Sequence, residues 1–300
     1  MKKYLYSIVI ATLILISTTV VKASNEVYYT NRENIEMTET EYNNLLGLGF
    51  TEKQIYRMDE QTFLNNKDIE GTVLSESIKY LRNYTILRNG ITTYRSEEIT
   101  EEEAIQDREL QAQNPQYRGG PVGSYYDGTV ATTTISVKAK IIGISNTRMR
   151  LMTDVDWYTI PSYRYNDIIA AGFESTKVQF ATGIVFREDW RDNNGNDYYE
   201  VECAPKQETN GGSAIFALPG GSLSQLEMYM YFNIKKASGV GTITALYSSG
   251  DYAHGTSYVS ASNLYNHYDV SQPGGISMDS TYGSYYQQNT AAQASFIGTW

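Results

Sequence analysis

The side chains best suited to catalysis are few in this chain of 300 residues. His254 and His267 are its only histidines, and Cys203 is its only cysteine. A nucleophilic enzyme needs a nucleophile, a base and a group that orients the base. Ser257 and Asp269 lie close to the histidines in sequence, but the strand–turn–helix elbow that presents a catalytic serine is not found. We interpret both histidines as ordinary loop or sheet residues.

Cys203 ends the stretch Y-E-V-E-C, where alternation places it on the inward face with Tyr199 and Val201. A buried cysteine usually acts as a small apolar residue. Paired with a histidine it would give a thiol enzyme, and two carboxylates across a cleft would give a glycosidase. A secreted hydrolase is therefore the alternative function. The sequence cannot pair its 34 acidic residues.

The loop Asp192–Asp197 is acidic and rich in asparagine, as calcium loops are. With Gly195 at the sixth position of such a loop, Trp190 would occupy the first and Val201 the twelfth, and neither can ligate calcium. Asn194-Gly195 is a good hairpin turn, so we predict a turn here. A loosely held surface cation is the open alternative, and we expect no cofactor.

Tyrosine is unusually frequent in this sequence, with 27 residues. Its flat apolar ring and polar tip suit the binding of glycans and proteins. Tyr229 and Tyr231 would stand side by side on the outward face of one strand, so we predict them as ligand-binding residues. The competing interpretation is that tyrosine is simply a good strand former.

A long hairpin at Thr132–Trp157 is the element around which the rest is organised. Ile135, Val137, Ala139 and Ile141 share one face of its first arm, and charges occupy the other face. Its second arm repeats the pattern across the turn at residues 145–147. Later segments read as further short strands separated by Gly, Pro and Asn turns: 167–173 (strand or short helix), 177–187, 198–203, 213–218, 226–236, 239–247, 257–261, 275–278 and 294–300. The fold class predicted is mainly β, with an antiparallel β-sandwich or jelly-roll-like domain at 129–300.

The part before this domain is predicted as three units. Residues 1–23 form a signal peptide with a basic start and an apolar centre. Residues 24–72 contain a small helical unit, opened by capping boxes at Thr38 and Thr51. Residues 73–128 hold a strand pair with an Asn89-Gly90 turn, followed by a Glu-rich stretch and a Gly- and Pro-rich linker.

Charge and cysteine content limit the partners. The signal carries three lysines and no acids, so its loss takes the formal charge from −10 to −13. Such an acidic chain is repelled by nucleic acids and anionic membranes. We expect no integral membrane segment after cleavage, and an exported chain with one thiol has no internal disulfide. The oligomeric state is not readable from the sequence.

Two stretches carry a resemblance. Residues 154–173, D-V-D-W-Y-T-I-P-S-Y-R-Y-N-D-I-I-A-A-G-F, and residues 45–55, L-L-G-L-G-F-T-E-K-Q-I, resemble uncharacterised secreted proteins of Gram-positive bacteria. The resemblance implies secretion and a β-rich main domain. It supplies no catalytic residues.

These observations favour a secreted, soluble, non-catalytic module, extracellular or loosely associated with the cell surface. Its expected ligand is an extracellular glycan or protein.

The signal yields a first prediction. Cleavage after Ala23 should give an exported protein that begins at Ser24, because small residues occupy the cleavage positions. N-terminal sequencing and intact mass of the protein in the culture medium check this. Recovery of the uncleaved chain in the membrane fraction would contradict it.

Overall fold

The computed structural model describes residues 26–113 and 129–300. The predicted signal at 1–23 and most of the predicted linker lie outside these residues. The strands are β1 (Tyr29–Thr30), β2 (Glu36–Met37), β3 (Thr72–Arg88), β4 (Ile91–Ile99), β5 (Thr129–Ser145), β6 (Arg148–Trp157), β7 (Asn166–Phe173), β8 (Val178–Phe180), β9 (Val185–Asp192), β10 (Asp197–Glu200), β11 (Ala204–Glu208), β12 (Gly211–Ala217), β13 (Leu223–Lys236), β14 (Ala245–Gly255), β15 (Tyr268–Ser271), β16 (Gly275–Met278), β17 (Tyr286–Gln288) and β18 (Ala292–Ile297). The helices are α1 (Glu39–Gly47), α2 (Glu52–Arg57), α3 (Glu60–Asn66), α4 (Glu101–Gln113), α5 (Ala261–Leu264) and the 3-10 turn η1 (Gly283–Tyr285). Among the described residues no helix is long and apolar enough to cross a bilayer.

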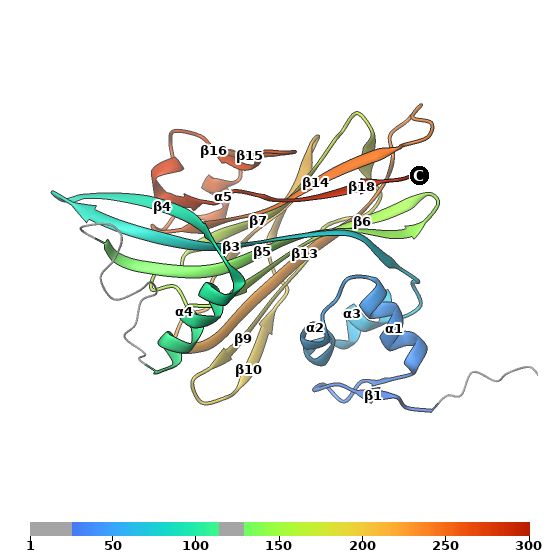
Figure 1. Cartoon of the computed structure of the whole chain (residues 1–300), viewed down its shortest axis with the longest axis horizontal. Helices are drawn as coiled ribbons and strands as arrows, with labels where there is room; N and C mark the ends of the chain where they lie inside the picture. The colour runs from blue at the N-terminus through green and yellow to red at the C-terminus, as the bar shows by residue number, and fades with distance from the viewer. Residues whose placement is uncertain (1–25, 114–128) are drawn as a thin grey trace, which may run out of the picture.

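Two antiparallel sheets pack face to face, which confirms the predicted fold class (Figure 1). The larger sheet runs β10-β9-β13-β6-β5-β3-β4, with β8 also pairing β13. The smaller runs β11-β12-β7-β14-β17, with β18 also pairing β14. The interior between them is built from the alternating apolar residues of both sheets.

The long hairpin is formed as predicted. Ile135 pairs with Trp157, Val137 with Val155 and Ile141 with Leu151, and all six side chains enter the sandwich interior. The turn lies where Ser145-Asn146-Thr147 indicated. The strand prediction for 257–261 is wrong, because Ser260 caps α5 instead. The segment 167–173 is strand β7, with β12 and β14 on its two sides.

Strands β3 and β4 belong to the large sheet rather than to a separate strand pair. β3 pairs with β5 along nearly its whole length, and β4 pairs with β3. The Glu-rich stretch completes β4 and then forms α4. Asp107 of this helix is buried and binds Arg82 of β3 through two contacts of 2.8 and 3.1 Å. The Glu-rich stretch is thus attached to the sheet.

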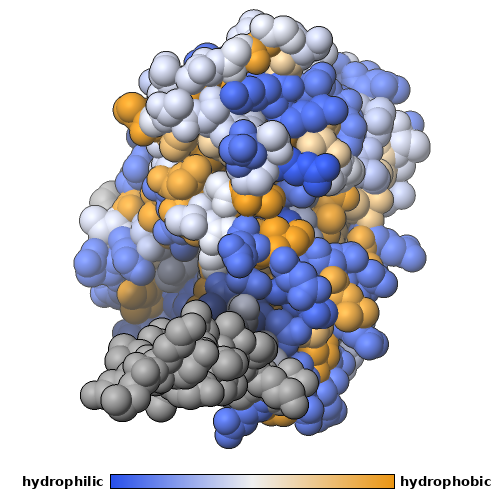
Figure 2. Space-filling view, turned by 90° about the vertical axis from the view of Figure 1, so that its right-hand side faces the viewer, coloured by the Kyte–Doolittle hydropathy of each residue, from blue (hydrophilic) through white to orange (hydrophobic). Residues whose placement is uncertain are grey.

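The three helices α1–α3 form as the caps predicted, and they cover the outer face of the large sheet (Figure 1). Leu45, Leu48, Phe50, Ile55, Met58 and Phe63 of this helical unit pack against Ile142, Met152, Tyr229 and Tyr231 of the sheet. On the side of the molecule that carries this unit, hydrophilic residues separate small hydrophobic patches (Figure 2).

Ion pairs surround this apolar contact. Arg57 of α2 binds Glu227 of β13 at 2.7 Å, and Arg187 of β9 binds Asp59 at 2.5 Å. Lys140 of β5 donates to a backbone carbonyl of the helical unit at 2.5 Å. Lys140 lies on the charged face of the first hairpin arm, and at this position the helical unit buries that face instead of leaving it in water. Buried charges are tolerated because each meets an opposite charge or a carbonyl.

The helical unit should therefore be essential to stability. Phe50 is 2% exposed and packs edge-on against Tyr229 and Tyr231, with ring centroids 5.5 and 5.8 Å away. Phe50→Ala should lower the free energy of unfolding by about 3–5 kcal/mol, since it leaves a cavity at the contact. Urea denaturation measures this.

Leu64→Ala is the matched control, because Leu64 belongs to the same unit and is 52% exposed. It should change the free energy of unfolding only slightly. Equal effects of the two substitutions would mean that the unit is not docked on the sheet.

Candidate functional site

One end of the sandwich interior is lined by polar side chains. Asn83 of β3 pairs directly with Ser96 of β4 and with Thr133 of β5. Leu81 and Ile135, two residues away on β3 and β5, enter the apolar interior, so Asn83 and Thr133 share that inward face. The three polar side chains form one row across three strands, which we call the polar row.

The smaller sheet faces this row with Gln287 of β17. Gln287 pairs with His254 of β14, and its Nε2 donates to Thr85 Oγ1 at 3.2 Å. Thr85 lies on the same face of β3 as Asn83. The bond therefore joins the two sheets at the level of the polar row.

Several polar atoms in this region are buried without a partner. Asn83 Nδ2, Asn83 Oδ1, Ser96 Oγ, Thr133 Oγ1 and Gln287 Oε1 have no hydrogen-bond partner among the described residues. Asn83 is only 1% exposed. Each buried polar group left unpaired costs about 1–3 kcal/mol, and native proteins hold few of them. A concentration of five such atoms needs an explanation.

Four of these atoms belong to Asn83, Ser96 and Gln287, which line an open crevice of about 380 Å³, whereas Thr133 is not part of that lining. One wall is β4, with Asn83 beneath it, and the other wall is the segment from η1 to β17. Both β4 and β17 are edge strands, so the crevice is the gap between the free edges of the two sheets. Its lining is Asn83, Thr92, Thr93, Tyr94, Arg95, Ser96, Gly283, Ser284, Tyr286, Gln287 and Gln288.

A second, narrow hollow lies further in and shares Gln287 with the crevice. Its free volume is about 10 Å³, and Thr85, Thr133, Thr256 and His254 line it among others. That volume is about the size of one water molecule. The hollow reaches the surface at Tyr163, which is 42% exposed.

His254 is held in place by Asp167 of β7. His254 Nδ1 lies 2.9 Å from Asp167 Oδ2, and the Gly255 amide donates to Asp167 Oδ1 at 2.8 Å. The Tyr252 hydroxyl donates to the same carboxylate, and the His254 ring meets Trp157 edge-on at 5.4 Å. An acid–histidine pair of this kind can orient a base, but it forms a hydrolytic site only where a nucleophile stands beside it. The sequence treated His254 as an ordinary sheet residue and could not place Asp167 beside it.

The remaining candidate nucleophile is Cys203, a free thiol that packs against the sandwich interior. Its burial raises the pKa of the thiol to about 11. The thiolate, which is the nucleophilic form, is therefore scarce at neutral pH.

Tyr229 and Tyr231 do not form a binding face. Their rings lie side by side, 6.3 Å apart and nearly parallel, and they point away from the sandwich interior as predicted. They are, however, only 0% and 5% exposed, because the helical unit covers them. The sequence pattern identified the face of the strand but could not show what packs on it, so the prediction of an accessible tyrosine pair is wrong.

Other tyrosines are exposed near the crevice. Tyr258 is 74% exposed and lies two residues after Thr256, which lines the narrow hollow. The carbonyl of Tyr285, an exposed residue between two lining residues, accepts from the Thr256 amide at 2.8 Å. Tyr285 is therefore next to the crevice lining in the chain, whereas Tyr163 lines the narrow hollow.

The other sequence candidates have local partners. His267 Nδ1 lies 2.7 Å from Asp279 on the surface. In the loop Asp192–Asp197, Asp192 accepts from the amides of Asn194 and Asn196 at 2.8 and 2.9 Å, as in a hairpin turn. Among the described residues no group of three or more acidic, His or Cys side chains has the arrangement of a metal site.

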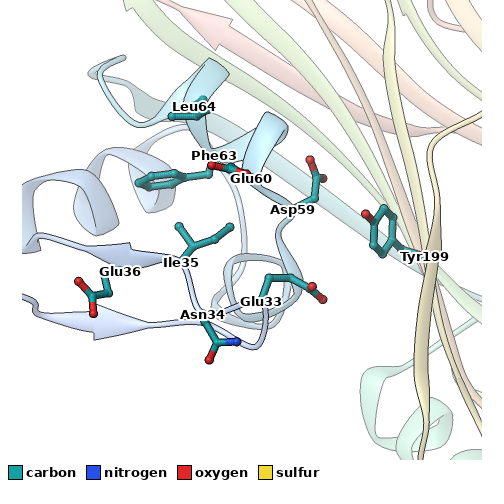
Figure 3. A pocket seen from close by; sticks show the side chains of 9 residues that line it. All are labelled: Glu33, Asn34, Ile35, Glu36, Asp59, Glu60, Phe63, Leu64 and Tyr199. Atoms are coloured by element: carbon teal, nitrogen blue, oxygen red, sulfur yellow. The ribbon is translucent and has the colours of Figure 1, made fainter.

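Another cleft, of about 570 Å³, lies between the helical unit and Tyr199 of β10 (Figure 3). Its acidic residues are Glu33, Glu36, Asp59 and Glu60. Asp59 is bound to Arg187 and caps α3, and Glu33 is bound to Arg32. With two of its carboxylates already paired, this cleft is a weaker candidate than the crevice.

Comparisons with known proteins give only remote likenesses. No family model and no curated protein match the chain. Among solved structures, the RrgA Jo.In complex is 7% identical and has a TM-score of 0.30, over 54% of this chain and 77% of that one. The collagen-binding domain of a Staphylococcus aureus adhesin is 11% identical with a TM-score of 0.21, over 36% and 77%. The collagen-binding domain of Erysipelothrix rhusiopathiae surface protein RspB is 6% identical with a TM-score of 0.27, over 56% and 63%. Scores below 0.5 do not establish a common fold.

Glu188 of β9 is a buried acid that feels the charge of Asp167, the partner of His254. Burial raises the pKa of its carboxyl well above the usual value, and the charge of Asp167 adds to the rise. A carboxyl whose pKa is higher in the folded than in the unfolded state stabilises the fold at low pH, and this contribution is complete below the unfolded pKa of about 4.3. The contribution is lost as the pH rises through the folded-state pKa. Glu188→Gln should therefore leave stability at pH 4 nearly unchanged and raise it at pH 8.

Urea midpoints from pH 4 to 8 check this, with Glu36→Gln as control. Glu36 is exposed and its charge is not among those that raise the pKa of Glu188, so its substitution should not alter the pH dependence. A Glu188→Gln variant whose stability follows the wild type at every pH would show that this carboxyl is solvated.

Proposed function

We propose that the chain is an exported, non-catalytic binding module for an extracellular glycan or protein, and that the ligand occupies the crevice. One observation carries the proposal. Four polar atoms without partners, on Asn83, Ser96 and Gln287, are buried along a crevice that is open to solvent. A ligand that pairs with them would recover the free energy that their isolation costs.

The chemistry of the lining favours binding over catalysis. Most side chains that line the crevice are amides, hydroxyls and tyrosine rings, which recognise ligands without reacting with them. The Asp167–His254 pair orients a base, yet the thiol of Cys203 is kept protonated by burial. Export is supported by the pattern of residues 1–23, which lie outside the described residues.

A binding role has a consequence for stability. Asn83→Leu replaces a buried, unpaired amide with an apolar side chain of similar shape. It should raise the free energy of unfolding by about 1–3 kcal/mol, because the unsatisfied groups are removed. The same substitution should abolish retention on any ligand that uses the crevice. Urea denaturation and binding to panels of immobilised glycans and extracellular matrix proteins measure the two effects.

Asn65→Leu provides the matched control, since Asn65 is an exposed residue of the helical unit. It should change neither binding nor stability appreciably. If Asn83→Leu destabilises the protein and leaves binding intact, Asn83 has a purely structural role and the proposal is wrong.

A further inference from the structure

We propose that the ligand is a neutral glycan whose terminal sugar enters the crevice end-on between the two sheets. This inference rests on the proposed function and names the ligand class of the same site. It follows from the polarity of the unpaired atoms, from their position relative to the sheet edge, and from the shape of the crevice.

The unpaired atoms require a ligand that can both donate and accept hydrogen bonds. Asn83 Nδ2 is a donor, whereas Asn83 Oδ1 and Gln287 Oε1 are acceptors. The hydroxyls of Ser96 and Thr133 can do either. Carboxylate, sulfate and phosphate groups only accept, and an ammonium group only donates. Sugar hydroxyls do both, and closely spaced hydroxyls can pair with the four unpaired atoms of the crevice lining, on Asn83, Ser96 and Gln287.

Charge disfavours an anionic glycan. The chain carries a formal charge of −10, and two of the unpaired crevice atoms are acceptors that would repel an anionic oxygen. Arg95 is the one permanently charged side chain among the crevice residues, and it already has an interaction within the molecule. The ligand is therefore uncharged.

The position of the polar row favours a glycan over a peptide strand as the ligand. Five consecutive β4 residues, Thr92–Ser96, line the crevice, and an extended peptide could in principle pair with this free edge. Such a strand would lie about 10 Å from β3, two strand spacings away, in the plane of the sheet. Its backbone could not reach Asn83 or Thr133, whose side chains stand on the inner face. A ligand inserted between the sheets reaches Asn83, which lines the crevice.

The crevice narrows along the polar row. Ser96 and Asn83 line the wide part, and Thr133 lines the narrow hollow, whose 10 Å³ admits no sugar ring. The chain of the glycan must therefore stop there, so a terminal residue occupies the wide part. The exposed ring of Tyr285, between two residues of the crevice lining, suits the apolar face of the following sugar.

The experiment uses the protein recovered from the culture medium on an array of neutral glycans, sulfated and uronic-acid glycans, and matrix proteins. Neutral glycans should bind, and free methyl hexosides should compete because they mimic a terminal residue. Binding should change little between 50 and 500 mM salt, since no ion pair is involved.

Ser96→Ala removes only a hydroxyl of the crevice lining and should weaken binding about tenfold, the usual effect of one lost hydrogen bond to an isolated buried partner. Thr147→Val in the exposed turn of the long hairpin is the matched control and should leave affinity unchanged. Circular dichroism confirms that each variant is folded.

The outcomes separate the two proposals. Binding of charged glycans or of a matrix protein, lost in Asn83→Leu, would overturn the neutral-glycan inference and leave the proposed function standing. Neutral-glycan binding without competition by methyl hexosides would overturn end-on entry. Binding that is unchanged in Asn83→Leu and Ser96→Ala, or no binding across the whole array, would overturn both.

Discussion

The central strands of the large sheet carry bulky side chains on both faces, and both faces must therefore be removed from water. On β13, Met228, Met230 and Phe232 point into the sandwich, while Tyr229 and Tyr231 point out of it. The smaller sheet covers the first set, and the helical unit covers the second. With both faces occupied, the free edges of β4 and β17 become the place where the interior can be reached from outside.

This arrangement gives the two ends of the interior different characters. Around Val137 and Leu151 the inward positions are apolar and closely packed, as burial requires. Around Asn83 and Gln287 the same strands place amides and hydroxyls inward, where they weaken folding unless something pairs with them. The apolar end of the interior thus stabilises the fold, and the polar end provides the groups for recognition. Burial at the apolar end offsets the free energy lost by the unpaired polar groups.

The sequence predicted the class of fold because alternation along Thr132–Trp157 and Leu226–Lys236 is strong. Capping residues Thr38 and Thr51 located the helices for the same local reason. What alternation cannot supply is the identity of the covering layer, which depends on contacts between residues far apart in sequence. For this reason the sequence placed Tyr229 and Tyr231 on the correct face of the strand but predicted the wrong exposure.

The sequence missed the crevice for a similar reason. Asn83 and Thr133 are polar residues in line with Leu81 and Ile135, a break in the pattern that becomes informative only once the pairing of β3 with β5 is known.

The docking of the helical unit also determines when this part of the chain can complete its folding. Residues 39–66 are synthesised long before their partners on β13, and the Arg57–Glu227 pair joins positions 170 residues apart. Until the later strands are complete, Phe50 and Leu48 have no sheet to pack against and remain exposed. Contacts of such sequence separation slow folding and lengthen the period in which a chain can aggregate. The first part of the protein to be made is thus among the last to reach its native surroundings, which makes this unit a natural point for a chaperone to act.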